Sequence, residues 1–146
     1  MGESDLRRMV LVVEDHTEHV QVIEQVLTKG AVDCDLVSTT TVKQANDFLH
    51  KRDRYTQAHR PDLILMNMHL SDGQAAALLR DIKTDTALRR IPTILLTPLA
   101  DSAEIFQGYR LQGNCYVLKP QNLSQLNQVI TAIESFWLNI VTLPAE

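Results

Sequence analysis

Polar side chains suited to metal and oxyanion chemistry stand directly after four short apolar runs of the sequence. Glu14 and Asp15 follow the first of these runs, and Asn67, Thr97 and Lys119 each follow a later one. Adjacent carboxylates at a buried edge repel each other and bind a hard divalent cation such as Mg²⁺ through their oxygens. A threonine hydroxyl and a lysine ammonium are suited to an anionic oxygen arriving near that metal.

The segments that must position these side chains alternate between two patterns. Five short β-rich runs occupy residues 9–13, 35–37, 63–66, 93–96 and 115–118. Continuous apolar runs of this length are typical of strands buried on both faces of a parallel sheet. Ligands bind to such a sheet outside the carboxyl ends of its strands. The polar residues that follow the strands are therefore predicted to converge at one edge.

Segments with helical spacing lie between and after these runs. Apolar stripes occur within residues 20–27, 42–49, 75–82, 103–111 and 123–140. Thr17 is the expected cap of the first helix, and the Ser38–Thr41 cluster precedes the second. Residues 50–61 are charged and polar, which is typical of a surface loop. Five strands alternating with five helices predict an α/β fold of the (βα)5 type, a doubly wound parallel sheet.

Four segments carry a specific resemblance to a known family. VVEDH (residues 12–16), PDLILMNMHLSDG (61–73), PTILLT (92–97) and YVLKP (116–120) resemble the signatures of CheY-type receiver domains, in order and in spacing. These domains are the phosphoacceptor modules of bacterial two-component response regulators. The resemblance runs from about Arg8 to Ile140. It implies one receiver domain over residues 1–146, with a core of about 8–140, an apolar tail of 141–146, and a flavodoxin-like sheet of strand order 2-1-3-4-5.

The resemblance also implies a role for each matching residue. Glu14, Asp15, the side chain at position 67 and the backbone carbonyl of His69 would bind Mg²⁺. Thr97 would be the switch hydroxyl, Tyr116 the aromatic switch, and Lys119 the lysine beside the acceptor. The Lys119–Pro120 bond is a candidate cis peptide, because proline follows.

Position 67 departs from the family pattern, since it holds asparagine where the family has the phosphoacceptor aspartate. An amide oxygen is a poor nucleophile and cannot form a stable acyl phosphate. The substitution also removes one negative charge from the metal pocket, so weaker Mg²⁺ binding is expected. Asn67 is compatible with a natural pseudo-receiver and with an engineered block of phosphorylation. Deamidation to aspartate, a sequence error or another acceptor nearby are further explanations.

The carboxyl-terminal segment, residues 114–144, resembles single-domain response regulators that are paired with cyanobacterial phytochrome kinases. The resemblance implies a phytochrome-type sensor histidine kinase as partner and a homodimer. The last helix also carries more apolar surface than packing on a sheet requires, and large apolar patches mark partner sites. The expected interface contains Phe136, Trp137, Ile140 and Leu143. The alternative is a tail that folds back over its own domain.

Composition limits the remaining functions. The 14 basic and 18 acidic residues give a net charge of −4, which argues against binding to nucleic acid or anionic membranes. The five scattered glycines form no phosphate-binding loop. Cys34 and Cys115 fit neither a disulfide framework nor a metal cluster, and buried free thiols of a reducing cytosol are expected. The absence of a signal peptide and of a long apolar run favours a cytoplasmic protein.

Two alternatives concern the same strand ends. His16, His19 and His69 are residues that could bind a transition metal, but they form no complete ligand set, and His16 and His19 are expected to be solvated at a helix start. A small α/β metal-dependent phosphoryl-group hydrolase would need an attacking carboxylate or a metal-activated water after the third strand. Because Asn67 supplies no nucleophile, a signalling domain that is not an enzyme is the favoured interpretation.

Overall fold

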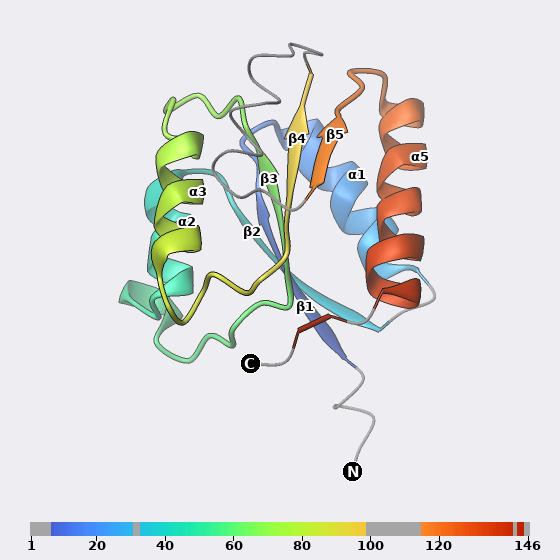
Figure 1. Ribbon diagram of the computed structural model, residues 1–146. Coiled ribbons are helices and arrows are strands. Elements are labelled where there is room, and N and C mark those ends of the chain that lie inside the picture. Colours follow the sequence, from blue (N-terminus) through green and yellow to red (C-terminus); the bar gives the residue numbers. More distant parts are fainter. Residues whose placement is uncertain (1–6, 31–32, 99–114, 142, 145–146) are drawn as a thin grey trace.

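The computed structural model describes residues 7–30, 33–98, 115–141 and 143–144. It contains a five-stranded parallel sheet in the order β2-β1-β3-β4-β5 (Figure 1). The strands are β1 (Arg8–Val13), β2 (Cys34–Thr39), β3 (Leu63–Asn67), β4 (Thr93–Thr97) and β5 (Cys115–Leu118). The predicted fold class and strand order are both confirmed. The predicted helix within residues 103–111 lies outside the described residues.

Helices cover both faces of the sheet. The helices are α1 (Thr17–Thr28), α2 (Val42–Leu49), α3 (Ala75–Thr84) and α5 (Leu123–Ile133). α2 and α3 lie on one face, and α1 and α5 lie side by side on the other (Figure 1). Successive strand residues point to opposite faces, so Leu11 and Val13 join one core cluster while Val10 and Val12 join the other. These two cores fix the strand ends that carry the polar residues.

Local sequence explains where two of the helices begin. The Thr41 side chain accepts a hydrogen bond from the Gln44 amide, and the Asn122 side chain accepts one from the Gln125 amide. The expectation of a Thr17 cap is wrong, because Thr17 is the first residue of α1 and His16 occupies the capping position without a side-chain hydrogen bond. The helix therefore begins one residue earlier than the predicted cap implies, a difference of the size that is usual at helix ends.

Described residues that follow α5 pack on their own domain. α5 continues into a π-helical segment, η3 (Glu134–Ile140). Leu138 and Leu143 are 6% and 9% exposed and belong to the core on the α1 and α5 face. The assignment of Leu143 to an intermolecular surface therefore does not fit its position, because its apolar surface is already covered within the chain. The side chain of Ile140 lies outside the described residues.

The loop and the cysteines largely follow expectation. Residues 50–61 are mostly exposed, with one 3-10 turn at Asp53–Tyr55. Both thiols are free; Cys34 is buried, and Cys115 is half-buried. Burial raises the pKa of the Cys34 thiol to about 11, so this thiol stays protonated and inert at neutral pH. Within the described ranges, no helix has the length and apolarity that crossing a bilayer requires.

Candidate functional site

Glu14 is the centre of the polar cluster at the carboxyl edge of the sheet. Its carboxylate is 1% exposed and forms an ion pair with Lys119, which is 5% exposed, at 2.5 Å from Nζ to Oε1. Its other oxygen, Oε2, accepts a hydrogen bond of 3.0 Å from the His16 amide. A buried charge is costly unless it is paired and hydrogen-bonded, and Lys119 supplies the pairing here.

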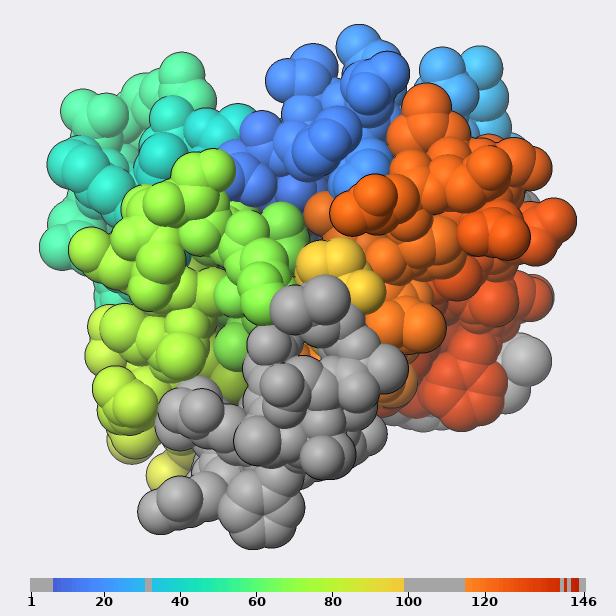
Figure 2. All heavy atoms as spheres, turned by 90° about the horizontal axis from the view of Figure 1, so that it is seen from above, coloured from blue at the N-terminus to red at the C-terminus, as the bar shows by residue number. Residues whose placement is uncertain are grey.

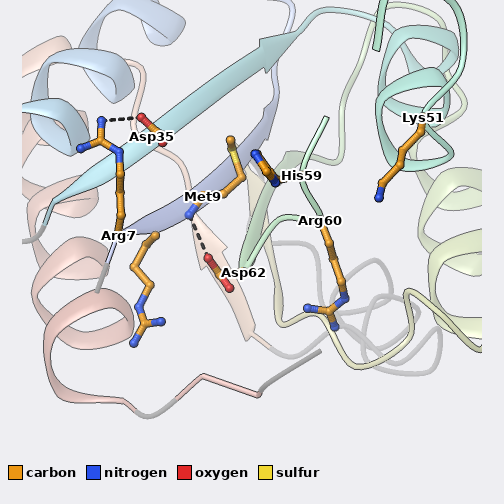
Figure 3. A pocket seen from close by; sticks show the side chains of 8 residues that line it. Arg7, Met9, Asp35, Lys51, His59, Arg60 and Asp62 are labelled. Atoms are coloured by element: carbon orange, nitrogen blue, oxygen red, sulfur yellow. Dashed lines mark hydrogen bonds and ion pairs between the residues drawn. The ribbon is translucent and has the colours of Figure 1, made fainter. Parts of the chain in front are cut away.

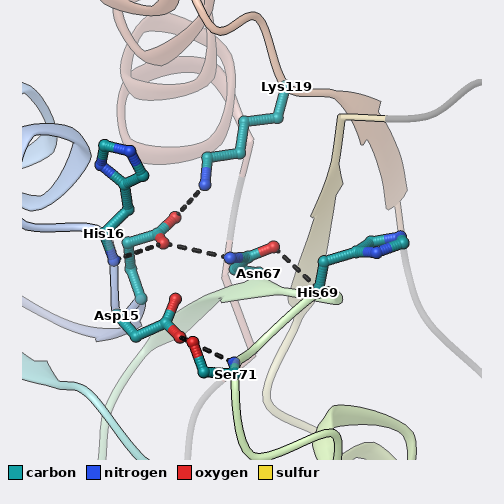
Figure 4. Close-up of polar contacts among 7 residues, drawn as sticks. Asp15, His16, Asn67, His69, Ser71 and Lys119 are labelled. Atoms are coloured by element: carbon teal, nitrogen blue, oxygen red, sulfur yellow. Dashed lines mark hydrogen bonds and ion pairs between the residues drawn. The ribbon is translucent and has the colours of Figure 1, made fainter.

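Asn67 binds the same carboxylate from the end of β3. Its Nδ2 donates to Glu14 Oε2 at 3.1 Å, and its Oδ1 accepts from the His69 amide at 2.9 Å. Figure 4 shows Lys119 and Asn67 reaching toward this carboxylate from two different strand ends. An amide can donate and accept in this way, whereas an ionised aspartate at position 67 has no donor and would repel Glu14.

Asp15 points to a different partner. Its Oδ2 accepts hydrogen bonds from both the hydroxyl and the amide of Ser71, the latter at 2.7 Å. Partial burial on its own would raise the pKa of Asp15, but the Ser71 hydrogen bonds outweigh burial and hold the pKa below its ordinary value. Asp15 is therefore a carboxylate at neutral pH. Ser71 was not among the predicted site residues, and its place four residues after Asn67 in the DG-containing loop was the available signal.

The remaining predicted residues lie around this cluster. Thr97 is buried at the end of β4, and its carbonyl accepts from the Lys119 amide at 2.5 Å. Tyr116 is half-buried on β5 and packs against the core beneath α2 and α3. The Lys119–Pro120 bond is trans, so the expectation of a cis bond is wrong; the trans form is the intrinsically preferred one even before proline.

The carboxyl ends of β1, β3, β4 and β5 meet at one face of the molecule (Figure 2). A hollow of about 240 Å³ opens there. Its lining includes Asp15, Asn67, His69, Ser71 and Lys119. The predicted convergence of the polar strand ends is thus observed.

The two histidines at the start of α1 stack on each other. The ring centroids of His16 and His19 are 3.9 Å apart, with 14° between the ring planes. His16 is exposed as expected, whereas His19 is 6% exposed, so the expectation of two solvated rings is wrong for His19. Burial, followed by the charge of Lys119, lowers the pKa of His19. No group of three His, Cys, Asp or Glu side chains placed to hold a metal ion occurs in the part of the chain that the structure describes.

The donor set at this edge suits a hard divalent cation in type. Glu14 and Asp15 offer carboxylate oxygens, and Asn67 and the His69 backbone offer carbonyl oxygens. One charge is missing relative to three carboxylates, and Lys119 already neutralises Glu14. A cation therefore has to compete with an ammonium group for its principal carboxylate.

A parallel 2-1-3-4-5 sheet with an acidic pair, a threonine and a lysine at its strand ends defines a receiver domain. The family model of the response regulator receiver domain matches residues 10–131, and the chain belongs to this family.

Individual relatives are similar over nearly the whole chain. The response regulator Rcp1 of Synechocystis sp. is 34% identical over 143 residues, which cover 98% of this chain and 97% of Rcp1. The phosphorylated cyanobacterial phytochrome response regulator RcpA superposes with a TM-score of 0.90 at 35% identity, covering 95% of this chain and 99% of RcpA. The Mn²⁺-bound form of Rcp1 gives a TM-score of 0.89 at 34% identity, covering 94% and 99% of the two chains.

Proposed function

We propose that this chain is the receiver component of a phytochrome-type histidine kinase pathway and that position 67 does not accept a phosphoryl group. The similarity to Rcp1 and RcpA supports the partner class. The proposal that position 67 does not accept a phosphoryl group rests on the Asn67 carboxamide. Its nitrogen donates a hydrogen bond to Glu14, and its oxygen accepts one from the His69 amide. A carboxamide in this arrangement presents no anionic oxygen for attack on phosphorus.

The remaining residues retain the features of a phosphoryl-binding pocket. Glu14, Asp15, Asn67 and the His69 carbonyl would hold Mg²⁺, which would neutralise the oxygens of an incoming phosphoryl group. Lys119 would contact the same oxygens, and Thr97 and Tyr116 would report occupancy to the β4 and β5 side as switch residues. Because Lys119 pairs with Glu14, we expect the cation to bind weakly.

Exposure to acetyl phosphate and Mg²⁺ followed by intact-mass measurement tests the loss of acceptor function. The unmodified chain is expected to gain no phosphate, and Asn67→Asp is expected to gain one. Asn67→Ala is the matched control and should behave as the unmodified chain does. A stable phosphate on the unmodified chain that Asn67→Ala abolishes would refute the proposal.

Reversion also separates two versions of the proposal. Asn67→Asp incubated with a phosphorylated phytochrome-type kinase should accept phosphate rapidly if Glu14, Asp15, Thr97 and Lys119 still form a working pocket. A reverted chain that binds Mg²⁺ yet accepts no phosphate would contradict the kinase pairing while leaving the receiver fold untouched.

The output of this single domain would be contact with other proteins, in the cytoplasm where such kinases present their phosphohistidine. Kinase docking would use α1 and the loops at the strand ends. Homodimerisation would use the apolar surface of α5 and the neighbouring edge strand β5. A groove of about 270 Å³ lies there, lined by Val117, Val129, Ala132, Ile133, Phe136 and Trp137. Phe136 is 51% exposed, which favours a second copy of the same surface as the covering partner.

Light scattering tests the homodimer. Phe136→Glu is expected to convert a dimer to a monomer, because it places a charge in the apolar groove. Leu123→Glu is the matched control, since Leu123 is 40% exposed at the start of α5, which continues into the segment of Phe136, but does not line the groove. A dimer that survives Phe136→Glu removes this interface. Truncation before Phe136 is unsuitable, because it deletes the core residues Leu138 and Leu143.

The phosphoryl hydrolase alternative gains no support from the site. Asn67 supplies no nucleophile, and both oxygens of Glu14 are engaged by Lys119, Asn67 and the His16 amide. Turnover of a generic phosphate ester by the purified chain is therefore expected to be absent.

A further inference from the structure

A second hollow lies at the amino-terminal edge of the sheet, away from the site described above. It has a volume of about 420 Å³, within the range of small-molecule sites. Its lining comes from the start of β1, from β2, from the end of α2 and from the segment before β3 (Figure 3). The residues are Arg7, Arg8, Met9, Asp35, Lys51, His59, Arg60 and Asp62.

The hollow is basic in a protein whose net charge is −4. Among the described residues, four of the chain's 14 lysines and arginines line it, against two carboxylates. Both carboxylates are engaged within the protein: Asp35 pairs with Arg7 at 2.5 Å, and Asp62 accepts a hydrogen bond of 2.9 Å from the Met9 amide. Among its described lining residues, the hollow therefore has two more cations than carboxylates.

Three of those cations have capacity for an anionic ligand. Within the described residues, the side chains of Arg8 and Lys51 form no ion pair or hydrogen bond, and Arg60 makes one long contact, 3.4 Å from Nε to the Ala87 carbonyl. Like charges held in one hollow repel each other, and a bound polyanion would remove that repulsion.

The backbone conformation of Lys51 supports a binding role for its side chain. Lys51 follows the last turn of α2 with φ of +56°, in the left-handed region that glycine prefers. Its amide donates to the Phe48 carbonyl at 3.2 Å, and the next amide, of Arg52, donates to the Asp47 carbonyl at 2.7 Å. A lysine is strained at this position, and strain of this kind is found where a side chain is needed for binding.

We propose that this hollow binds a compact polyanion of the diphosphate class through Arg8, Lys51 and Arg60. The cluster offers two guanidinium groups and one ammonium group, which together suit several phosphate oxygens. Among the lining residues that the structure describes, only Met9 and His59 have apolar or aromatic side chains, so the charged group itself provides the recognition. The assignment does not depend on phosphoryl chemistry at position 67.

Titration calorimetry with pyrophosphate at low salt tests the proposal. EDTA is included, so that metal-assisted binding at the other edge of the sheet does not contribute. One saturable site per chain is expected. Lys51→Gln and Arg60→Gln should each weaken binding about tenfold, the loss expected for one charge-assisted hydrogen bond. Lys29→Gln is the matched control, because Lys29 is an exposed lysine after α1 that does not line the hollow.

A second variant separates binding from folding. Lys51→Gly removes the cation and also relieves the left-handed strain, so Tm should rise while pyrophosphate affinity falls. ADP measured on the same variants distinguishes two sources of a diphosphate: tighter binding of ADP with the same dependence on Lys51 supports a nucleotide. Absence of a saturable site overturns the proposal, as does an equal loss in Lys29→Gln. Loss in Lys119→Met with retention in Lys51→Gln would place binding at the other edge.

Discussion

The two edges of the sheet differ in whether their charged side chains are buried and paired or exposed and unpaired. At the carboxyl edge, Glu14 and Lys119 are buried and paired with each other. At the amino edge, Lys51 is exposed and pairs with no side chain of the described ranges. A buried charge must find its partner inside the protein, because water does not reach it. An exposed cation is solvated and screened, so the fold tolerates it unpaired and a ligand can still use it.

Breaking the buried pair should give the largest effect. Lys119→Met leaves the Glu14 carboxylate buried without its cation, and a loss of about 3–5 kcal/mol in the free energy of unfolding is expected. Urea denaturation measures it. Adding Glu14→Gln should restore much of the loss. Lys43→Met is the control, since Lys43 pairs with Asp47 at the surface at 2.9 Å, and its denaturation midpoint should not move. Equal effects of the two lysine variants would contradict the contrast between buried and exposed charge.

Restoring the third carboxylate should strain the same edge. In Asn67→Asp the hydrogen bond to Glu14 becomes a repulsion, and a loss of about 2 kcal/mol is expected in EDTA. Millimolar Mg²⁺ should return the stability of this variant and change that of the unmodified chain far less, because ligand binding stabilises the folded state. Thermal melts with and without Mg²⁺ measure how much the metal stabilises each chain. Equal stabilisation of the two chains by Mg²⁺ would disprove the weakened metal site.

A third lysine, Lys83, is buried near the start of β4 and has backbone carbonyls as hydrogen-bond acceptors. Its Nζ donates to the Ile91 carbonyl at 2.7 Å, and burial lowers its pKa from 10.5 to about 8. The unfolded chain therefore holds more protons between these two pH values, so stability should rise as pH increases from 8 to 10.5. A gain of about 1–2 kcal/mol relative to Lys83→Met is expected, after allowance for solvent screening.

Denaturant titrations at several pH values measure the Lys83 effect. Lys83→Met serves as the reference for the unmodified chain. The cysteine, tyrosine and other lysine groups that titrate in this range contribute equally to both chains, so their effect cancels in the difference. A difference between the two chains that is independent of pH would show that Lys83 has an ordinary pKa in the folded protein.

The smallest effect is expected at Asp15. Ser71→Ala removes a hydrogen bond that lowers the pKa of this carboxyl group. A lowered carboxyl pKa contributes stability that is present above the unfolded value of 3.8 and lost as pH falls through the folded value. Because Asp15 is largely solvated, this effect should make the free energy of unfolding of the unmodified chain only a few tenths of a kcal/mol larger than that of Ser71→Ala at neutral pH. The difference should decline below pH 3.8.

The fold was largely predictable because its signals are local. Short β-rich runs marked all five strands, and the Leu63–Asn67 strand extends the predicted segment by one residue. The predictions failed where the outcome depends on the exact end of a helix or on tertiary packing. The Thr17 cap failed because helix ends are fixed by backbone geometry. The burial of His19 was missed because it depends on tertiary packing, which residue spacing does not record.

The clustering of polar residues at the strand ends was predictable from the sequence, and the pairings among them were not. The strand ends indicated five residues: Glu14, Asp15, Asn67, Thr97 and Lys119. Asp15, Asn67 and Lys119 line one hollow. Glu14 contacts Asn67 and Lys119, and the Thr97 carbonyl accepts from the Lys119 amide. Which side chain contacts which was not accessible from the sequence, since Lys119 could pair with any anion at that edge. The part played by Ser71 was missed for the same reason: a hydroxyl in a loop has no periodicity that reveals its acceptor.

The sequence by itself determined the family, the parallel sheet and the presence of asparagine at position 67, because strand runs, motif order and residue identities are properties of the chain. Only the tertiary structure decided that Lys119 neutralises Glu14, that Leu143 packs inward and that four basic residues share one hollow. Those outcomes depend on distances between residues far apart in sequence. Desolvation and Coulomb interactions are set by such distances, so they emerge only when the chain is folded.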